Sequence, residues 1–229
     1  MKHPPFITFE GPEGSGKSTQ IRLLAERLRG AGLPVLLTRE PGGTRTGEAI
    51  RRLVQHESSD AEMADRTEAL LFCASRAQLV EETIRPALAR GEWVLCDRFT
   101  DSTLAYQGFG RGFSISELRA LNAFATGGLT PHLTILLDIA PDEGFRRLSV
   151  RKAAEIDRIE RAGLEFHERL RQGYLELART DPARFRVLST DRPMEATHEA
   201  IWQTVRERFG SILQETNGGA ACTSTKHGN

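Results

Sequence analysis

Residues 6–19 read FITFEGPEGSGKST, a short apolar run that enters a glycine-rich turn and leaves as a helical pattern. Gly11, Gly16, Lys17 and Ser18 match G-x-x-x-x-G-K-[ST], the phosphate-binding P-loop. The glycines let backbone N–H groups point inward at phosphate oxygens, and the following helix directs its positive dipole end to the same place. Lys17 is then the expected cation for the β- and γ-phosphates, and the Ser18 hydroxyl an expected Mg²⁺ ligand.

The composition suits one α/β domain. The chain has 229 residues, of which 27% are charged, and its formal net charge is zero. This balance leaves no electrostatic footprint for nucleic-acid or membrane binding, and no apolar stretch approaches membrane-spanning length. The three cysteines have no paired metal-ligand spacing, and the N-terminus lacks a signal-peptide pattern. We therefore expect a soluble cytoplasmic protein in a reducing compartment.

Five short apolar runs alternate with helical patterns, which predicts a parallel sheet with right-handed crossovers. The predicted strands are Phe6–Phe9, Val35–Thr38, Trp93–Cys96, Leu133–Leu137 and Phe185–Leu188. Together with the P-loop they predict an α/β P-loop NTPase fold, a five-stranded parallel sheet flanked by helices. In such folds ligands bind at the carboxyl ends of the strands.

Polar residues follow three of the predicted strands. Arg39 lies at the base of a Pro-Gly-Gly loop, where it could hold a second anionic group. Asp97 and Arg98 follow the third strand, and the acid fits a Walker-B-like role in holding Mg²⁺ or its water shell. Asp138, after the fourth strand, is a second candidate for that role. We rank it below Asp97 because no basic residue follows it.

Residues 62–90 form one long helix-compatible segment, which Pro86 is expected to kink or split. Within it Phe72 and Arg76 are one helical turn apart and share a face. An aromatic ring beside a guanidinium suits a flat heterocycle, with stacking from one and hydrogen-bond donors from the other. Taken alone, the pair is more simply interpreted as a core phenylalanine beside a solvated arginine.

The segment 149–160 carries many charges and few apolar anchors. By itself such a run is most simply a solvated helix face. Beside a P-loop, it predicts a mobile lid that brings arginines to transferring phosphates and excludes water. We expect residues 1–214 to form the domain, and residues 215–229 to be a disordered tail because they are small and polar.

The P-loop indicates a nucleotide but no reaction. A regulatory GTPase would need D-x-x-G and N-K-x-D motifs, which the chain lacks, and a large motor ATPase would need far more chain. A small kinase remains. It needs a second anion site, a platform for a base and a charged lid, and positioning with charge neutralisation would supply its rate.

The order of the motifs resembles the thymidylate kinase family, in its bacterial form. The motifs are residues 10–19, Arg39-Glu40-Pro41-Gly42-Gly43-Thr44, Phe72 with Arg76, Asp97-Arg98-Phe99, Ala105-Tyr106-Gln107-Gly108 and Asp157-Arg158-Ile159-Glu160. The resemblance implies phosphorylation of dTMP to dTDP with ATP and Mg²⁺, in dTTP biosynthesis, by a homodimer.

The resemblance also implies roles for individual residues. The ATP phosphates would contact Gly11, Pro12, Glu13, Gly14, Ser15, Gly16, Lys17, Ser18 and Thr19. The acceptor dTMP would contact Glu13, Arg39, Phe72, Arg76, Arg98, Thr103, Tyr106 and Gln107. The catalytic residues would be Lys17, Asp97, Arg98 and Arg158, and the metal ligands would be Ser18 and Asp97.

In the acceptor pocket, the resemblance implies that Glu13 bonds the 3′-hydroxyl and that Tyr106 crowds the sugar 2′ position, favouring deoxyribose. Phe72 would stack on thymine, and Arg76 would reach its O4 atom. Arg39 and Arg98 would hold the dTMP phosphate.

The chain departs from parts of the family pattern. Some members carry a catalytic arginine in the P-loop, whereas here Gly14 follows the P-loop carboxylate. The arginine would therefore come from the lid region, with Arg158 the first candidate, Arg151 the second and Arg147 a further one. Phe99 stands where many members have tyrosine or histidine.

Two other functions stay open from the sequence. One is a P-loop kinase for another nucleoside monophosphate, because the choice of acceptor depends on a few contacts. The other is a regulatory nucleotide-binding module. The arginine-rich segment argues against this module, since a protein that transfers nothing has little use for a closing cationic lid.

Overall fold

The protein, described by a computed structural model over residues 4–55, 63–148 and 163–219, contains a five-stranded parallel sheet. The strands lie in the order β2-β3-β1-β4-β5. They span Phe6–Glu10 (β1), Val35–Arg39 (β2), Trp93–Asp97 (β3), Leu133–Asp138 (β4) and Phe185–Ser189 (β5). The predicted fold is confirmed, and each strand continues one residue beyond the predicted end. Those added residues include Glu10, Arg39 and Asp97, so the strands deliver polar side chains to one edge.

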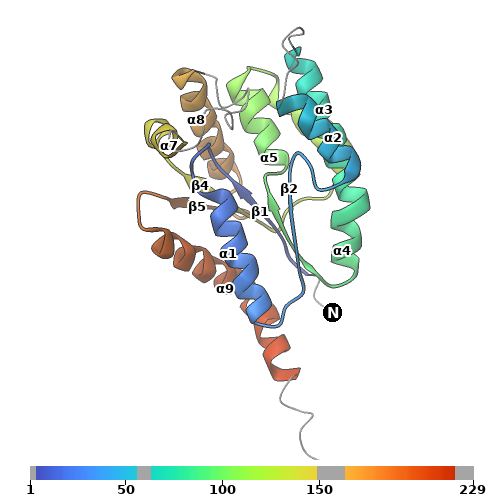
Figure 1. Ribbon diagram of the computed structural model, residues 1–229, viewed down its shortest axis with the longest axis vertical. Helices are drawn as coiled ribbons and strands as arrows, with labels where there is room; N and C mark the ends of the chain where they lie inside the picture. Colours follow the sequence, from blue (N-terminus) through green and yellow to red (C-terminus); the bar gives the residue numbers. More distant parts are fainter. Residues whose placement is uncertain (1–3, 56–62, 149–162, 220–229) are drawn as a thin grey trace, which may run out of the picture.

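One face of the sheet is covered by α1 (Lys17–Gly30) and α9 (Met194–Gly219), which lie side by side in Figure 1. Ile7 and Phe9 of the central strand point to this face and pack against apolar residues of both helices. Because side chains alternate along a strand, Phe6 and Glu10 point to the opposite face.

The opposite face is covered in two parts. The first is a continuous helical column of α3 (Asp65–Leu79), a π-helical turn η1 (Val80–Ile84) and α4 (Arg85–Ala89). The second pairs a π-helical turn η2 (Leu104–Gly110) with α8 (Leu164–Thr180). The remaining helices are α2 (Arg45–Gln55), α5 (Thr100–Thr103), α6 (Ile115–Thr126) and α7 (Pro141–Leu148).

Pro86 is expected to kink or split the helical segment, and in the structure a π-helical turn separates α3 from α4. A proline inside a helix removes one hydrogen bond and crowds the carbonyl four residues earlier. Here the five-residue π-helical turn lies directly before α4, and Pro86 occupies the first turn of that helix. The wider turn accommodates the proline without ending the helical column.

Two expected segments fall wholly or partly outside the described residues. The expected lid, 149–160, lies outside them. Helix α9 extends through Gly219, so it includes the first five residues of the expected tail. No helix among the described residues is both long and apolar enough to cross a membrane.

The contact between η2 and α8 depends on a glycine. A Cβ atom at Gly173 would lie 2.5–2.7 Å from the ring base and Cβ of Phe109. Those Phe109 atoms lie near the backbone and cannot simply swing away. Gly173 therefore lets α8 approach η2 closely, and its neighbour Tyr174 is then placed at the site described below.

We expect Gly173→Ala to lower the free energy of unfolding by about 1–3 kcal/mol, because the added methyl overpacks this contact. Gly30→Ala is a matched control, since no atom lies within 4 Å of a Cβ built there. The control should gain about 0.4–1 kcal/mol through the unfolded state. Denaturant titration measures both, and equal stability of the two variants would contradict this packing argument.

Candidate active site

The P-loop adopts a conformation that two glycines make possible. Gly11 has φ +139°, and a Cβ there would lie 2.3 Å from the carbonyl oxygen of Leu137. Gly14 has φ +73°, and its Cβ would lie 2.4 Å from the carbonyl oxygen of Gly144. Helix α1 begins after Gly16, and no side chain caps its N-terminus. The backbone N–H groups at the start of α1 are therefore free to bind an anion.

Lys17 lies over the loop and is almost fully buried. Its ammonium donates hydrogen bonds to the carbonyl oxygens of Gly11, at 2.9 Å, and Pro12, at 2.8 Å. Burial lowers the pKa of Lys17 to about 8, the nearby Arg98 acts in the same direction, and the Glu13 carboxylate opposes both. Such a lysine gains stabilisation when phosphate charge arrives beside it.

The two candidates for the Walker-B-like acid, Asp97 and Asp138, have different partners. Asp97 accepts a hydrogen bond from the Ser18 hydroxyl, with 2.8 Å between the oxygens. Asp138 forms a bidentate ion pair with Arg171 of α8, at 2.7 and 2.8 Å. The described residues contain no group of three or more His, Cys, Asp or Glu side chains placed to hold a metal ion. The Ser18–Asp97 pair thus joins oxygen ligands from the P-loop and β3.

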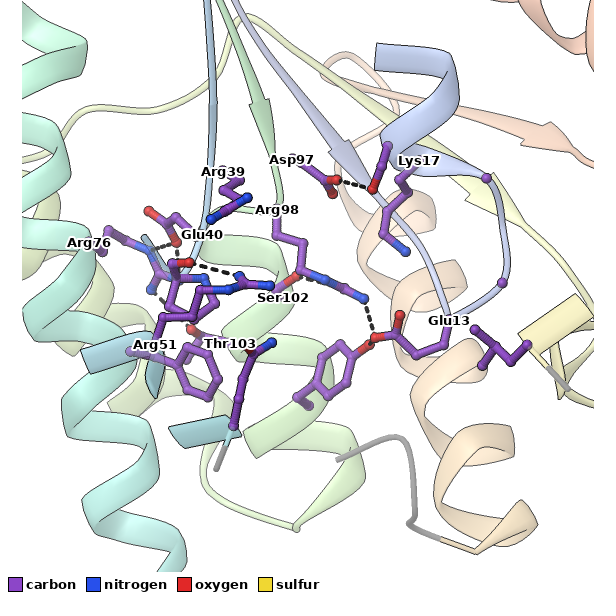
Figure 2. A pocket seen from close by; sticks show the side chains of 18 of the residues that line it. Glu13, Lys17, Arg39, Glu40, Arg51, Arg76, Asp97, Arg98, Ser102 and Thr103 are labelled. Atoms are coloured by element: carbon purple, nitrogen blue, oxygen red, sulfur yellow. Dashed lines mark hydrogen bonds and ion pairs between the residues drawn. The ribbon is translucent and has the colours of Figure 1, made fainter. Parts of the chain in front are cut away.

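Arg98 connects the P-loop to the rest of the cavity. Its guanidinium forms an ion pair with Glu13, and its Cζ atom lies 5.0 Å from the centre of the Tyr106 ring. The Tyr106 hydroxyl donates a 2.7 Å hydrogen bond to the same Glu13 oxygen. Figure 2 shows Arg98 and Glu13 beside Lys17. The predicted sugar and phosphate contacts therefore form one connected group.

Charge keeps Glu13 ionised. Burial alone would raise the pKa of its carboxyl, but Arg98 and Lys17 outweigh that effect and lower the pKa to about 2. The Tyr106 hydrogen bond acts in the same direction. Burial raises the pKa of Tyr106 well above its ordinary value, so its hydroxyl stays a donor. A carboxylate in an anion-binding loop is thus neutralised by two cations.

Arg76 is fully buried, and protein acceptors surround its guanidinium. Glu40 forms the ion pair, with 2.7 Å between Nη2 and the carboxylate. The remaining N–H groups reach the hydroxyl of Thr103 at 3.0 Å, the side-chain oxygen of Asn122, and the carbonyl oxygen of Phe99 at 3.1 Å. A ligand oxygen at Arg76 would therefore share or replace one of these acceptors.

The P-loop and the residues around Arg98 and Arg76 border a cavity of about 380 Å³. It is lined by every predicted acceptor residue: Glu13, Arg39, Phe72, Arg76, Arg98, Thr103, Tyr106 and Gln107. It is also lined by Lys17, Ser18 and Asp97, so the P-loop and the acceptor residues share one space. Arg39 is half-exposed there and forms an ion pair with Glu48 at 3.1 Å.

The cavity also contains residues that the sequence analysis missed, Arg51 and Ser102. Arg51 of α2 lines the cavity and is labelled in Figure 2, and Arg147 of α7, the third of the predicted candidates for a catalytic arginine, lines it too. Ser102 lies beneath Arg98, with 3.2 Å between its hydroxyl and Nη1. Arg51 had a signal, since it lies one helical turn from Gly47 and from Val54 and thus beside the buried face of α2. Of the lid candidates, Arg151 and Arg158 lie outside the described residues.

The fold and the cavity together define a P-loop kinase, with a phosphate-donor loop and a second pocket that offers arginines and an aromatic ring. Comparisons with known proteins identify the family. A family model described as thymidylate kinase matches residues 9–201. The chain belongs to the thymidylate kinase family.

Individual relatives agree with this assignment. The chain is 53% identical over 208 residues to a thymidylate kinase of Deinococcus radiodurans, covering 91% of this chain and 99% of the relative. It is 51% identical over 220 residues to one from a Roseiflexus species, covering 91% and 96%. A crystal structure of the Ehrlichia chaffeensis thymidylate kinase matches with a TM-score of 0.72 and 33% identity, covering 90% of this chain and 100% of that one.

Lys17→Ala and Arg98→Ala should each lower kcat/KM by at least about 100-fold, because each removes a cation from developing phosphate charge. Both variants should remain folded by circular dichroism. Arg22→Ala is the control, because Arg22 is an exposed cation of the same helix α1 and forms a surface ion pair with Glu26. Wild-type turnover in either site variant would contradict the assignment of that residue.

Proposed function

We propose that this protein transfers the γ-phosphoryl group of ATP to dTMP, giving ADP and dTDP, a step in dTTP biosynthesis. The observation that carries the proposal is the single cavity, in which the P-loop lysine and all eight expected acceptor residues meet. Membership of the thymidylate kinase family supports the choice of acceptor.

The transfer is an in-line displacement. A phosphate oxygen of dTMP forms a bond to the γ-phosphorus, while the bond to the β,γ-bridging oxygen breaks and its electron pair leaves with ADP. The protein contributes positioning and charge. Lys17 follows the migrating phosphoryl group, and Arg98 holds the acceptor phosphate close to the P-loop.

The other end of the cavity suits the nucleoside. The half-buried Phe72 ring offers a stacking surface, and Arg76 with Thr103 offers polar groups at the edge of a base. Glu13 would accept a hydrogen bond from the 3′-hydroxyl. Tyr106, held by its hydrogen bond to Glu13, would crowd a 2′-hydroxyl and so favour deoxyribose.

The Ser18–Asp97 pair fits Mg²⁺, because this cation prefers hard oxygen ligands and both side chains present oxygens to the same place. When bound with ATP, Mg²⁺ would neutralise charge on the β- and γ-phosphates. Further cationic charge would come from an arginine, with Arg158 as the first candidate and Arg151 as the second. Arg147 already lines the cavity.

ADP release with ATP and Mg²⁺ against a panel of acceptors tests the proposal. The panel is dTMP, dUMP, UMP, CMP, AMP, GMP and no acceptor. We expect fast turnover with dTMP, slower turnover with dUMP and near-background rates otherwise, because the pocket selects a thymine deoxynucleotide. Lys17→Ala is the negative control for contaminating kinases.

Two outcomes would contradict this function. Turnover with another monophosphate would keep the P-loop kinase but reject the thymine pocket. ADP release that ignores the acceptor would identify an ATPase and reject the acceptor site as a whole.

We also propose that the protein is a homodimer. Three exposed apolar side chains support this: Phe124 of α6 is 89% exposed, and Leu70 of α3 and Leu53 of α2 are each 57% exposed. Helix α3 packs against both α2 and α6, so these residues lie on neighbouring helices. Apolar surface of this kind marks association sites in soluble proteins.

Light scattering coupled to gel filtration should give twice the chain mass of 25.4 kDa. Phe124→Asp should shift the protein toward monomer, because it places a charge within the apolar contact. Val187→Lys is the control, because Val187 is 42% exposed on the edge strand β5, away from these helices. A wild-type monomer at micromolar concentration would refute the dimer.

A cytoplasmic location is part of the proposal. Cys73 and Cys96 are free buried thiols, a state that suits a reducing compartment.

A further inference from the structure

The carboxylate of Glu10 is a buried group to which the proposed mechanism assigns no task. Glu10 ends β1, directly before the P-loop, and its side chain is fully buried on the face covered by η2 and α8. It accepts hydrogen bonds from the Phe99 N–H at 2.7 Å, the Ser102 hydroxyl at 2.6 Å and the Tyr174 hydroxyl at 3.0 Å. Three donors, two from the start of α5 and one from α8, therefore meet at one carboxylate.

Two of these donors also contact Arg98. The Ser102 and Tyr174 oxygens each lie 3.2 Å from its Nη1 atom. The two hydroxyls also lie 3.0 Å from each other. With Glu10 as the acceptor for both of them, their lone pairs are left to accept from the guanidinium. The carboxylate thus determines the direction in which both hydroxyls present their lone pairs, and both present them to Arg98.

The third donor acts on the backbone of Arg98. Arg98 has φ +71°, a left-handed conformation that is unfavourable for a residue other than glycine. Its own N–H donates to the carbonyl oxygen of Phe9 at 2.9 Å, and the next N–H, from Phe99, donates to Glu10. Glu10 therefore holds one side of the strained turn that directs Arg98 into the cavity.

We propose that Glu10 is a positioning residue for the acceptor phosphate. Through Phe99, Ser102 and Tyr174 it holds Arg98 in the orientation that binds dTMP. This inference rests on the proposed function of Arg98 and adds a residue that does not itself touch the substrate.

Electrostatics supports the same view. Burial raises the pKa of Glu10 to about 7, and the neighbouring Asp101 adds to that rise, whereas Arg98 and the hydrogen bonds from Ser102 and Phe99 lower it. The positive charge of Arg98 thus stabilises the ionised form of Glu10, and the hydroxyls of Ser102 and Tyr174 lie between the two groups. No direct ion pair between Glu10 and Arg98 is present, so the hydroxyls carry the coupling.

Glu10→Gln is the primary test, because it keeps the shape but replaces one accepting oxygen with a donating NH₂. We expect kcat/KM for dTMP to fall about 10- to 100-fold, the effect of losing hydrogen bonds to a charged group. The KM for ATP should change less than about twofold, since the Lys17 ammonium bonds to P-loop oxygens and not to Glu10. Steady-state kinetics with each substrate varied separately measures this difference.

Tyr174→Phe and Ser102→Ala each delete one bridging hydroxyl. Each should raise the KM for dTMP about threefold to tenfold, and either change combined with Glu10→Gln should be less than additive, because they act through one network. Thr204→Val is the control. Thr204 is buried in α9, the helix that covers the opposite face of the sheet, and its hydroxyl donates to the Ala200 carbonyl oxygen at 2.9 Å, so its loss should lower stability but leave the KM for dTMP unchanged.

The outcomes separate the two proposals. If the wild-type protein does not phosphorylate dTMP, the proposed function fails. If it does, and Glu10→Gln keeps the wild-type KM for dTMP, only the positioning role fails. A fall in kcat alone that matches a loss of folded protein would also overturn the role, and Tyr174→Phe decides the matter if Glu10→Gln does not fold.

Discussion

The ion pair between Arg98 and Glu13 is the interaction on which the rest of the site depends, because it joins the P-loop to the acceptor pocket. It forms only because Arg98 adopts a positive φ at the end of β3, so that its side chain turns back toward β1. Tyr106 then completes the group by bonding to Glu13 and lying beside the guanidinium. One strained backbone position thus connects three elements that are far apart in the chain.

Charge balance in the cavity follows from that pair. Lys17 and Arg98 together exceed the charge of Glu13, and their proximity lowers the pKa of Lys17, while Glu13 opposes the effect. The site therefore holds two cations close together at a cost that phosphate groups relieve. Substrate binding and electrostatic relief are then the same event, as a phosphoryl-transfer site requires.

Local patterns predicted most of the fold because its signals are local. The P-loop, the apolar strands and the polar residues after them are contiguous in sequence, and all eight expected acceptor residues line one cavity. The surroundings of Arg76 could not be predicted, since Glu40 and Asn122 lie 36 and 46 residues away. The π-helical turn before Pro86 also lacks a sequence signal of its own, because it relieves a clash that propensity alone would resolve by ending the helix.

Glu10 illustrates what a motif leaves out. The P-loop pattern begins at Gly11, so the residue before it reads as the end of an apolar strand. Strand alternation, however, turns Glu10 away from Ile7 and Phe9 and toward the face where Ser102 and Tyr174 lie. A fully buried carboxylate at the tip of a central strand needs donors, and those donors here are the groups that hold Arg98. The strand that delivers the P-loop to the nucleotide therefore also carries the residue that orients the acceptor site, which couples the two halves of the cavity through β1 itself.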